Sequence, residues 1–443
     1  MTSRRLALPF ALALALAGAA HAEDLMQIYR EAQQNDPSLA AARANWQATQ
    51  ERVPQARAAL LPSVSAGGNL NANEGRQTIY THPRTGSQNV FAASNLTISA
   101  AQPLFRAQSV VALSQAQRQV EQADYTLAAS QQDLMIRVAV AYFDVLLAEV
   151  NVELVESQKA AVSEQLAQAR RNFEVGVATI TDTNEAQARY DSIVAQEIIA
   201  RNDLDNRRTV LRTIIGRMPG ELEKLAPGFQ PTLPEPNVLD PWLDRALADN
   251  LSVRIAGFNL DVATLEIDRA RAAHLPTVDL VAGASHALGT GTLLTEANSQ
   301  TRTTQIGLAI SIPLYQGGFI DSRIRESFAL QEAARQNLEV ARRNAVSNAQ
   351  VGFSGVNSAA ASVRAFEQAL VSAQTALESN RLGLEVGVRT NLDVLNVTQQ
   401  LFQVRRDLAQ SYFNYMISLL RLKAAVGALT EQDLEEINRR LAG

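Results

Sequence analysis

Cysteine is absent from the 443 residues, lysine is scarce, and clusters of basic residues are lacking. The missing cysteine excludes disulfides, thiolate metal sites, cysteine catalysis and a lipid anchor on an N-terminal cysteine. The formal net charge of −5 argues against a nucleic-acid partner. Beyond the N-terminal segment, no apolar run reaches the roughly eighteen residues that a transmembrane helix requires. If the chain enters a membrane, it must therefore do so through strands.

The N-terminus has the pattern of a signal peptide. Two arginines precede an apolar run over 6–17, and an Ala-His-Ala motif that ends at Ala22 offers a cleavage site. Residues 1–22 are therefore predicted to be removed during export, which leaves Glu23 as the first residue of the mature chain. A retained membrane anchor is the alternative, but this apolar run is too short to span a bilayer.

The sequence contains an internal duplication. The motif Ala-Arg-Ala-Ala-x-Leu-Pro occurs at 56–62 and again at 270–276, and Val-Gly-Val-x-Thr occurs at 175–179 and 386–390. These motifs follow one another in the same order in both halves, which indicates a tandem repeat. The two halves are therefore predicted to contain the same helices and strands in the same order.

The duplication divides the chain into segments. A first structural repeat covers 23–216 and a second covers 242–427. Between them, 217–241 contains six prolines, too many for a continuous helix or a central strand, and is predicted to be a linker that contributes to an equatorial segment. Residues 428–443 form a C-terminal segment. Each repeat is predicted to contain a helix, two strands, a very long helix and a shorter returning helix.

Heptad spacing predicts the long helices. Apolar or small residues recur at every seventh position over 113–169 and again over 338–373. A helix over 108–172 would be about 100 Å long at about 1.5 Å per residue. Such a helix must belong to a rod, a coiled coil or a tube rather than to a globule. The first helix of each repeat is predicted over 25–60 and 242–274, and a proline ends each one.

Apolar residues alternate with small or polar residues after each Leu-Pro corner, which predicts four strands. The segments are 64–72, 95–100, 278–285 and 306–312. Four strands of about ten residues are long enough to cross a membrane, yet they would leave two open edges in lipid. Two copies would give eight strands with a filled interior, whereas three copies would give twelve strands around a lumen. A conduit therefore favours a trimer.

The predicted fold class is mainly α with membrane β. Each chain supplies four transmembrane strands and long coiled-coil helices, and three chains form a 12-stranded β-barrel on a helical periplasmic barrel. A non-channel structural coiled-coil protein of the periplasm is the alternative. It explains the heptads, but it gives no role to four membrane-length strands at equivalent places in the two repeats.

Several motifs together resemble those of a known family. They are the paired Ala-Arg-Ala-Ala-x-Leu-Pro corners, the strand exits Pro-Leu-Phe105 and Pro-Leu-Tyr315-Gln-Gly-Gly, the paired Val-Gly-Val-x-Thr turns, and the segment from Asp393 to Leu401 (Asp-Val-Leu-Asn-Val-Thr-Gln-Gln-Leu). Each is weak alone, but the set is specific. The mature chain resembles TolC and its relatives, the outer-membrane efflux proteins, over nearly its whole length.

The resemblance implies a homotrimeric channel-tunnel in the lipid of the Gram-negative outer membrane that extends into the periplasm. Its implied role is exit duct of a tripartite export machine, for drug or small-molecule efflux or for type I protein secretion. The implied partners are a periplasmic adaptor (membrane fusion protein) and an inner-membrane pump of the ABC, RND or MFS type. The resemblance also implies an equatorial belt and a gate at the periplasmic end.

The two Val-Gly-Val-x-Thr turns, at the far ends of the long helices, are the most informative sites. Glycine suits the left-handed position after a helix, and Thr-x-x-Asp is typical of a capping box for the next helix. We therefore expect Thr179 with Asp182, and Thr390 with Asp393, to cap helices. Capping does not exclude a further role in a gate.

The resemblance assigns two functional groups to these hairpins. The periplasmic gate comprises Thr181, Asp182, Arg389, Asp393 and Asn396. The adaptor-docking tips comprise Val175, Gly176, Thr179, Val386, Gly387 and Thr390. The sequence departs from the family at two gate positions, with Asn396 in place of a second aspartate and Leu384 in place of a tyrosine. Cation binding at a ring of three Asp393 carboxylates is therefore expected to be weaker than in TolC.

Nothing in the sequence indicates an enzyme, a cofactor or a resident metal. His82, His274 and His286 lie in a predicted loop, a helix end and a strand, without metal-ligand spacing. The Gly-Thr-Gly segment at 289–291 lies in a predicted hairpin loop rather than between strand and helix, and no serine lies in a nucleophile motif. A periplasmic enzyme is therefore the weakest of the three hypotheses.

Overall fold

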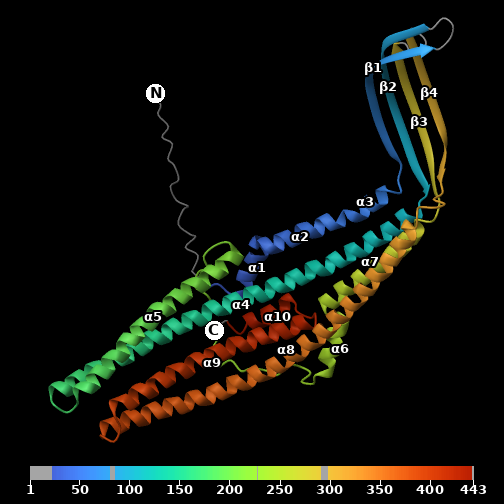
Figure 1. Ribbon diagram of the computed structural model, residues 1–443. Coiled ribbons are helices and arrows are strands. Elements are labelled where there is room, and N and C mark those ends of the chain that lie inside the picture. Colours follow the sequence, from blue (N-terminus) through green and yellow to red (C-terminus); the bar gives the residue numbers. More distant parts are fainter. Residues whose placement is uncertain (1–21, 80–84, 227, 291–297, 442–443) are drawn as a thin grey trace, which may run out of the picture. The chain divides into compact units, whose positions relative to one another are not determined.

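The computed structural model describes residues 22–79, 85–226, 228–290 and 298–441 (Figure 1). The predicted signal peptide, apart from its last residue, and His82 lie outside these ranges. None of the helices in this part of the chain has the length and hydrophobicity needed to cross a membrane.

Helices and strands follow the same order in both halves of the chain (Figure 1). The first half contains α1 (Leu25–Asn35), α2 (Pro37–Gln50), α3 (Arg52–Ala58), β1 (Ser63–Ile79), β2 (Thr85–Phe105), α4 (Ala107–Glu174) and α5 (Ile180–Ile215). The second half contains α6 (Asp240–Asp249), α7 (Leu251–Ala272), β3 (Thr277–Thr290), β4 (Asn298–Ser311), α8 (Phe319–Glu385) and α9 (Asn391–Ala425), and α10 (Glu431–Asn438) follows.

The chain folds into two compact units that do not coincide with these halves. One unit comprises the residues up to Ala42, Ala128–Asn250, and those from Arg343 onward. The other comprises Arg43–Leu127 and Leu251–Arg342 and contains all four strands. Both units therefore combine residues from the first and the second half.

The prediction of one continuous first helix in each half is wrong. Residues 25–60 form three helices, and 242–274 form two. Asp36 has an extended backbone, with ψ 118°, because the following proline disfavours the helical region, and its carboxylate accepts a 2.8 Å bond from the Leu39 amide. Burial raises the pKa of this carboxyl, but hydrogen bonds led by those from Arg137 lower it to about 2. In the second half, Asn250 separates α6 from α7, with ψ 127°.

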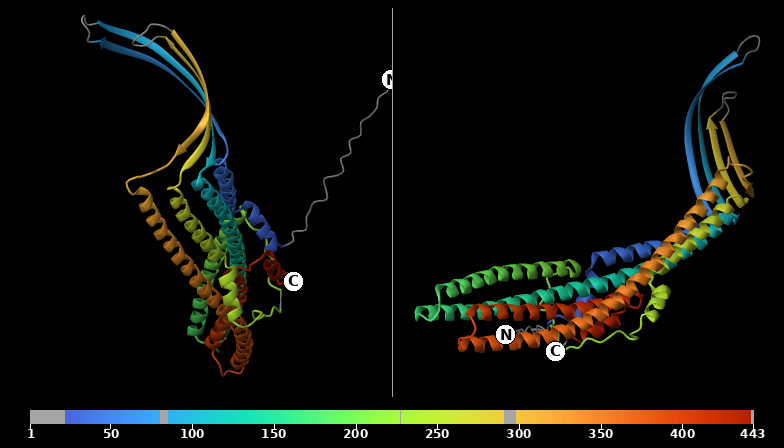
Figure 2. Two further views of the ribbon diagram at one scale, coloured as in Figure 1. Left: turned by 90° about the vertical axis from the view of Figure 1, so that its right-hand side faces the viewer. Right: turned by 60° about the horizontal axis from the view of Figure 1, so that its bottom comes forward.

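The four strands form one antiparallel sheet in the order β1-β2-β3-β4, which Figure 2 shows as a single curved layer. They contain 14 to 21 residues each and are longer than predicted. The register pairs Ala66 with Ile98, and Ile98 with Ala284. Residues paired in this way share a face, so the predicted apolar face is continuous across the strands. The opposite face carries mainly small or polar residues and contains a 2.8 Å bond between the Ser65 and Ser99 hydroxyls.

The two long helices confirm the heptad prediction. Helix α4 has 68 residues and α8 has 67, and each turns back into a shorter helix, α5 or α9. The helices α4, α5 and α9 share an apolar cluster, which consists of Val155, Val162, Leu166, Ala169, Ala186, Ile193, Ala200 and Leu395. At its margin Lys159 of α4 and Glu197 of α5 form an ion pair of 2.6 Å, which lowers the pKa of Glu197. This cluster fastens the hairpins together.

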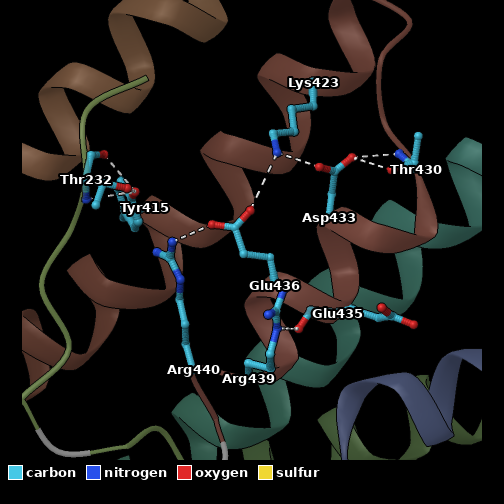
Figure 3. Close-up of polar contacts among 9 residues, drawn as sticks. All are labelled: Thr232, Tyr415, Lys423, Thr430, Asp433, Glu435, Glu436, Arg439 and Arg440. Atoms are coloured by element: carbon cyan, nitrogen blue, oxygen red, sulfur yellow. Dashed lines mark hydrogen bonds and ion pairs between the residues drawn. The ribbon is translucent and has the colours of Figure 1, made fainter. Parts of the chain in front are cut away.

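Helix α9 holds both the C-terminal helix α10 and the linker (Figure 3). Thr430 and Asp433 form its capping box, and Lys423 of α9 binds Asp433 and Glu436. The hydroxyl of Tyr415, also on α9, donates a 2.8 Å bond to the carbonyl of Thr232 in the linker and accepts a 3.1 Å bond from the Thr232 amide. Linker and C-terminal segment thus pack on one helix, as a belt built from both would require.

The glycines that follow α5 and α9 have similar backbones but differ in how closely other atoms approach them. Gly216 and Gly427 both have left-handed backbones, with φ 86° and 71°. A Cβ at Gly427 would overlap the carbonyl oxygen of Asp249 and lie 2.7 Å from its carbon, whereas a Cβ at Gly216 would meet only Asn35, at 3.7 Å.

We expect Gly427→Ala to destabilise the protein by more than about 3 kcal/mol, because strain and a backbone clash add. Gly216→Ala should cost only the strain, about 1–2 kcal/mol. The two variants can be compared by their apparent unfolding temperatures and by their yields of folded protein in detergent. Equal effects would contradict the close approach at Gly427.

Candidate gate and docking turns

The two hairpin turns have the same backbone geometry. Gly176 follows α4 with φ 78°, and Gly387 follows α8 with φ 80°. The amide of Val177 donates a 2.8 Å bond to the carbonyl of Asn172, and the amide of Val388 donates a 2.9 Å bond to that of Gly383. These bonds satisfy carbonyls that a helix end leaves free, and left-handed glycine permits them.

Both predicted capping boxes are confirmed. At α5, the Asp182 amide donates to the Thr179 hydroxyl at 3.2 Å, and the Thr179 amide donates to the Asp182 carboxylate at 2.9 Å. At α9, Thr390 and Asp393 make the same two bonds at the same distances. The hydrogen bonds from the Thr390 amide and hydroxyl, followed by the nearby charge of Arg389, lower the pKa of Asp393. The cap of α9 thus favours the ionised form of Asp393.

The predicted gate residues are only partly brought together within one chain. In the described residues no ion pair or hydrogen bond joins Arg389 to Asp182, whose carboxylate is occupied by its own cap. The Arg389 side chain lies over Gly383, where a Cβ would come within 2.6 Å of the arginine Cγ. Thr181 is exposed. The contact between Arg389 and Asp182 therefore stays a prediction for the assembled channel.

A contact that the sequence did not predict joins the two hairpins. Arg189 of α5 donates from one guanidinium nitrogen to the Asn396 side-chain oxygen, at 3.0 Å, and from another to that of Gln399, at 2.8 Å. Asn396 and Gln399 lie one turn apart on α9. Nothing in the heptad pattern marks Arg189, because its partners lie 207 and 210 residues away in the sequence.

Buried polar groups lie beside this contact. Thr398 of α9 is 1% exposed and donates a 2.7 Å bond to the carbonyl of Val394. The side-chain amide of Gln165, on α4, donates a 3.4 Å bond to the Thr398 hydroxyl, and its own oxygen has no partner. The start of α9 is thus seated on α4 and α5 by an apolar cluster and by polar contacts.

The tips of the two turns expose apolar side chains. Val175 and Val177 are 72% and 75% exposed, and Val386 and Val388 are 64% and 75% exposed. A Cβ on Gly176 or Gly387 would meet nothing within 4 Å. The left-handed backbone, rather than crowding within the chain, is the reason for glycine, and the space above each turn is open.

The pattern that defines the outer membrane efflux protein family matches residues 28–217 and 242–428. The chain belongs to this family. It is 35% identical to the outer membrane protein TolC of Vibrio cholerae over 96% of this chain and 95% of that protein. It is 34% identical to TolC of Escherichia coli over 98% of this chain and 89% of that protein. It is also 32% identical to the alkaline protease secretion protein AprF of Pseudomonas aeruginosa over 98% and 91%.

Solved structures of outer membrane channels share the fold. The outer membrane protein VceC of Vibrio cholerae superimposes with a TM-score of 0.75 at 20% identity, over 91% of this chain and 96% of that one. The Campylobacter jejuni CmeC outer membrane channel superimposes with a TM-score of 0.77 at 15% identity, over 99% and 98%. At this identity the likeness concerns the fold, and it agrees with the predicted class of long helices and membrane strands.

Membership in the outer membrane efflux protein family confirms three predictions. They are the family itself, the location in the outer membrane with an extension into the periplasm, and the assignment as a channel protein rather than an enzyme.

Among the described residues, no group of three or more His, Asp or Glu side chains could hold a metal ion. His274 lies 3.6 Å from Asp321 and His286 lies 2.7 Å from Gln300, as ordinary polar contacts.

Proposed function

We propose that this outer membrane efflux protein is the exit duct of a tripartite export machine, assembled as a homotrimeric channel-tunnel. One observation carries the proposal. Four antiparallel strands of at least 14 residues share an apolar face, and the same chain continues into helices of 67 and 68 residues. The strands suit lipid, and the helices suit a long conduit below it.

Trimer formation follows from the edges of the sheet. Strands β1 and β4 lie at the two ends of the strand order. Unpaired backbone groups at such edges cost several kcal/mol each in lipid, so further copies must pair with them. Three copies give twelve strands and a lumen, with Leu308 and Ile310 facing lipid.

We expect purified protein in detergent to have the mass of three chains. Analytical ultracentrifugation or mass photometry with the detergent contribution subtracted measures this. A folded monomer that inserts stably into membranes would contradict the tunnel.

The exported solute and the pump belong to the same proposal. The relatives include TolC proteins, the protease secretion proteins PrtF and AprF, and the outer membrane efflux protein BepC. Efflux of drugs or small molecules and type I protein secretion are both supported by these names. The pump, of the ABC, RND or MFS type, decides between them, and mass spectrometry of cross-linked inner-membrane partners identifies it.

The gate and the docking tips complete the proposal. Thr181, Asp182, Arg389, Asp393 and Asn396 form the periplasmic gate, in which Asp393 supplies a ring of charges that favours cations. Val175, Gly176, Thr179, Val386, Gly387 and Thr390 form the tips that receive the periplasmic adaptor. Exposed valines beside open space support the docking role, because a partner gains most from covering apolar surface.

Conductance in planar bilayers tests the proposed function. Purified protein should give discrete steps with a low resting conductance. A structural coiled-coil protein would give none, so the absence of steps from protein with the mass of a trimer would overturn the proposal.

A further inference from the structure

The contact between Arg189 and α9 joins the two hairpins at their surface, whereas the 3.4 Å bond from Gln165 to Thr398 joins them in the buried interior. Lys159 with Glu197, and Arg170 with Gln187, join α4 to α5 within the first hairpin. Arg189 instead reaches across to the second hairpin. It holds Asn396 and Gln399 at 3.0 and 2.8 Å with separate nitrogens of one planar group.

This forked geometry is specific to arginine. A guanidinium presents several N–H groups in a fixed plane, so it can bind two acceptors at once, whereas the ammonium of lysine is a single compact centre. Two side chains one turn apart on α9 are therefore held together by a single residue on α5. The contact resists both sliding and rotation of α9.

The position of this contact ties it to the gate. Asn396 is three residues beyond Asp393, and Leu395 and Thr398 are buried against the first hairpin. Asn396 and Gln399 are exposed, so the Arg189 bonds lie at the rim of that buried contact. A rim contact can break without unpacking the core, which is what a reversible movement of α9 requires.

We infer that Arg189 is a positioning residue of the gate, whose bonds to Asn396 and Gln399 hold α9 in its resting place on α5. The inference rests on the proposed channel function and adds a residue that the resemblance did not assign. Asn396 thereby gains a second role, since it anchors α9 rather than adding a charge to the constriction.

Conductance of single channels tests this inference. We expect Arg189→Gln to raise the open fraction at rest about tenfold, the change that about 1.4 kcal/mol makes in an equilibrium constant. Arg189→Lys should give an intermediate rise, because it keeps the charge but cannot bind both acceptors together. A role as a fixed pore charge predicts instead that lysine behaves like the parent.

Arg170→Gln is the matched control. Arg170 donates a 2.6 Å bond to Gln187, so this variant removes an arginine bond of the same chemistry that does not touch α9. Its resting conductance should equal that of the parent. An equal rise in Arg170→Gln and Arg189→Gln would mean general loosening of the hairpins and would overturn the inference.

A cross-link provides an independent readout. Because the chain lacks cysteine, Arg189→Cys with Gln399→Cys creates the only thiol pair. The double-cysteine variant lacks the Arg189 bonds, so its resting conductance should be raised. A short bis-maleimide that links the two thiols should return the conductance to the parental level. If the parent conducts but Arg189→Gln does not differ from it, the inference fails and the channel stands. If the parent itself gives no conductance, the proposed function fails instead.

Discussion

Tryptophan at both Gly176 and Gly387 should abolish export while trimers still reach the outer membrane. A Cβ at either position meets nothing within 4 Å in the chain, so the large side chains would project into the open space above the turns. An adaptor that packs on the exposed valines would need that space, and overlap at all six turns of a trimer would block docking. Export in cells and adaptor co-purification measure the effect.

Backbone strain is the competing explanation, since both glycines are left-handed. Gly317 and Gly318, between β4 and α8, have φ of 63° and 81° and also have open space around them. Tryptophan at these two positions imposes comparable strain away from the tips. It should leave adaptor binding intact. Equal loss of export in both pairs, or unchanged export in Gly176→Trp with Gly387→Trp, would contradict docking at the turns.

Regular periodicity explains which parts of the fold could be predicted from the sequence. The predicted helix over 108–172 lies just within α4, because apolar residues repeat at every seventh position along its whole length. The turns were equally clear, since Gly and Thr-x-x-Asp each act on the backbone within a few residues. Local interactions of this kind leave a local pattern.

Interactions between distant residues left no such pattern. The break at Asp36 carries a proline signal, but the role of its carboxylate depends on Arg137, 101 residues away. The break at Asn250 has no proline, and its side chain donates to the carbonyl of Ala425, 175 residues away. The strands are longer than predicted because some of their segments, such as 73–79, show no apolar alternation in the sequence. These segments are strands because they pair with β2.

The candidate site shows the same division. The caps of α5 and α9 follow from four neighbouring residues each, whereas the seating of α9 on α5 depends on Arg189 and on partners in the other half of the chain. Asp182 illustrates how the two levels combine. Its cap bonds are local and observed, whereas its proposed gate role depends on contacts with Arg389 that would form only in the assembled channel.

Alanine at both Arg389 and Asp182 should raise the resting conductance. Each exposed contact contributes about 0–1 kcal/mol, but threefold symmetry removes three at once, which shifts a closed-to-open equilibrium appreciably. Asp182→Ala also removes the carboxylate half of the capping box of α5 and so weakens the start of that helix. Arg389→Ala with Asp182→Asn is therefore the control, because asparagine keeps an acceptor oxygen but loses the charge. If only the alanine pair conducts more than the parent, Asp182 caps α5 and does not latch the gate.

Asp393→Ala should have a different effect, chiefly a loss of cation preference and of divalent-ion block. The proposed role of its carboxylate is that of a pore charge rather than a latch, so the resting conductance should stay low. The bonds from Thr390 lower the pKa of the Asp393 carboxyl below its ordinary value. The carboxylate therefore keeps its charge at any pH above that ordinary value and loses it only at lower pH. Reversal potentials of the parent should therefore show cation preference from pH 7 down to about 4, and lose it at lower pH. Asp393→Ala should show no such pH dependence. Reversal potentials in Asp393→Ala that match the parent at every pH would mean that Asp393 caps α9 and nothing more.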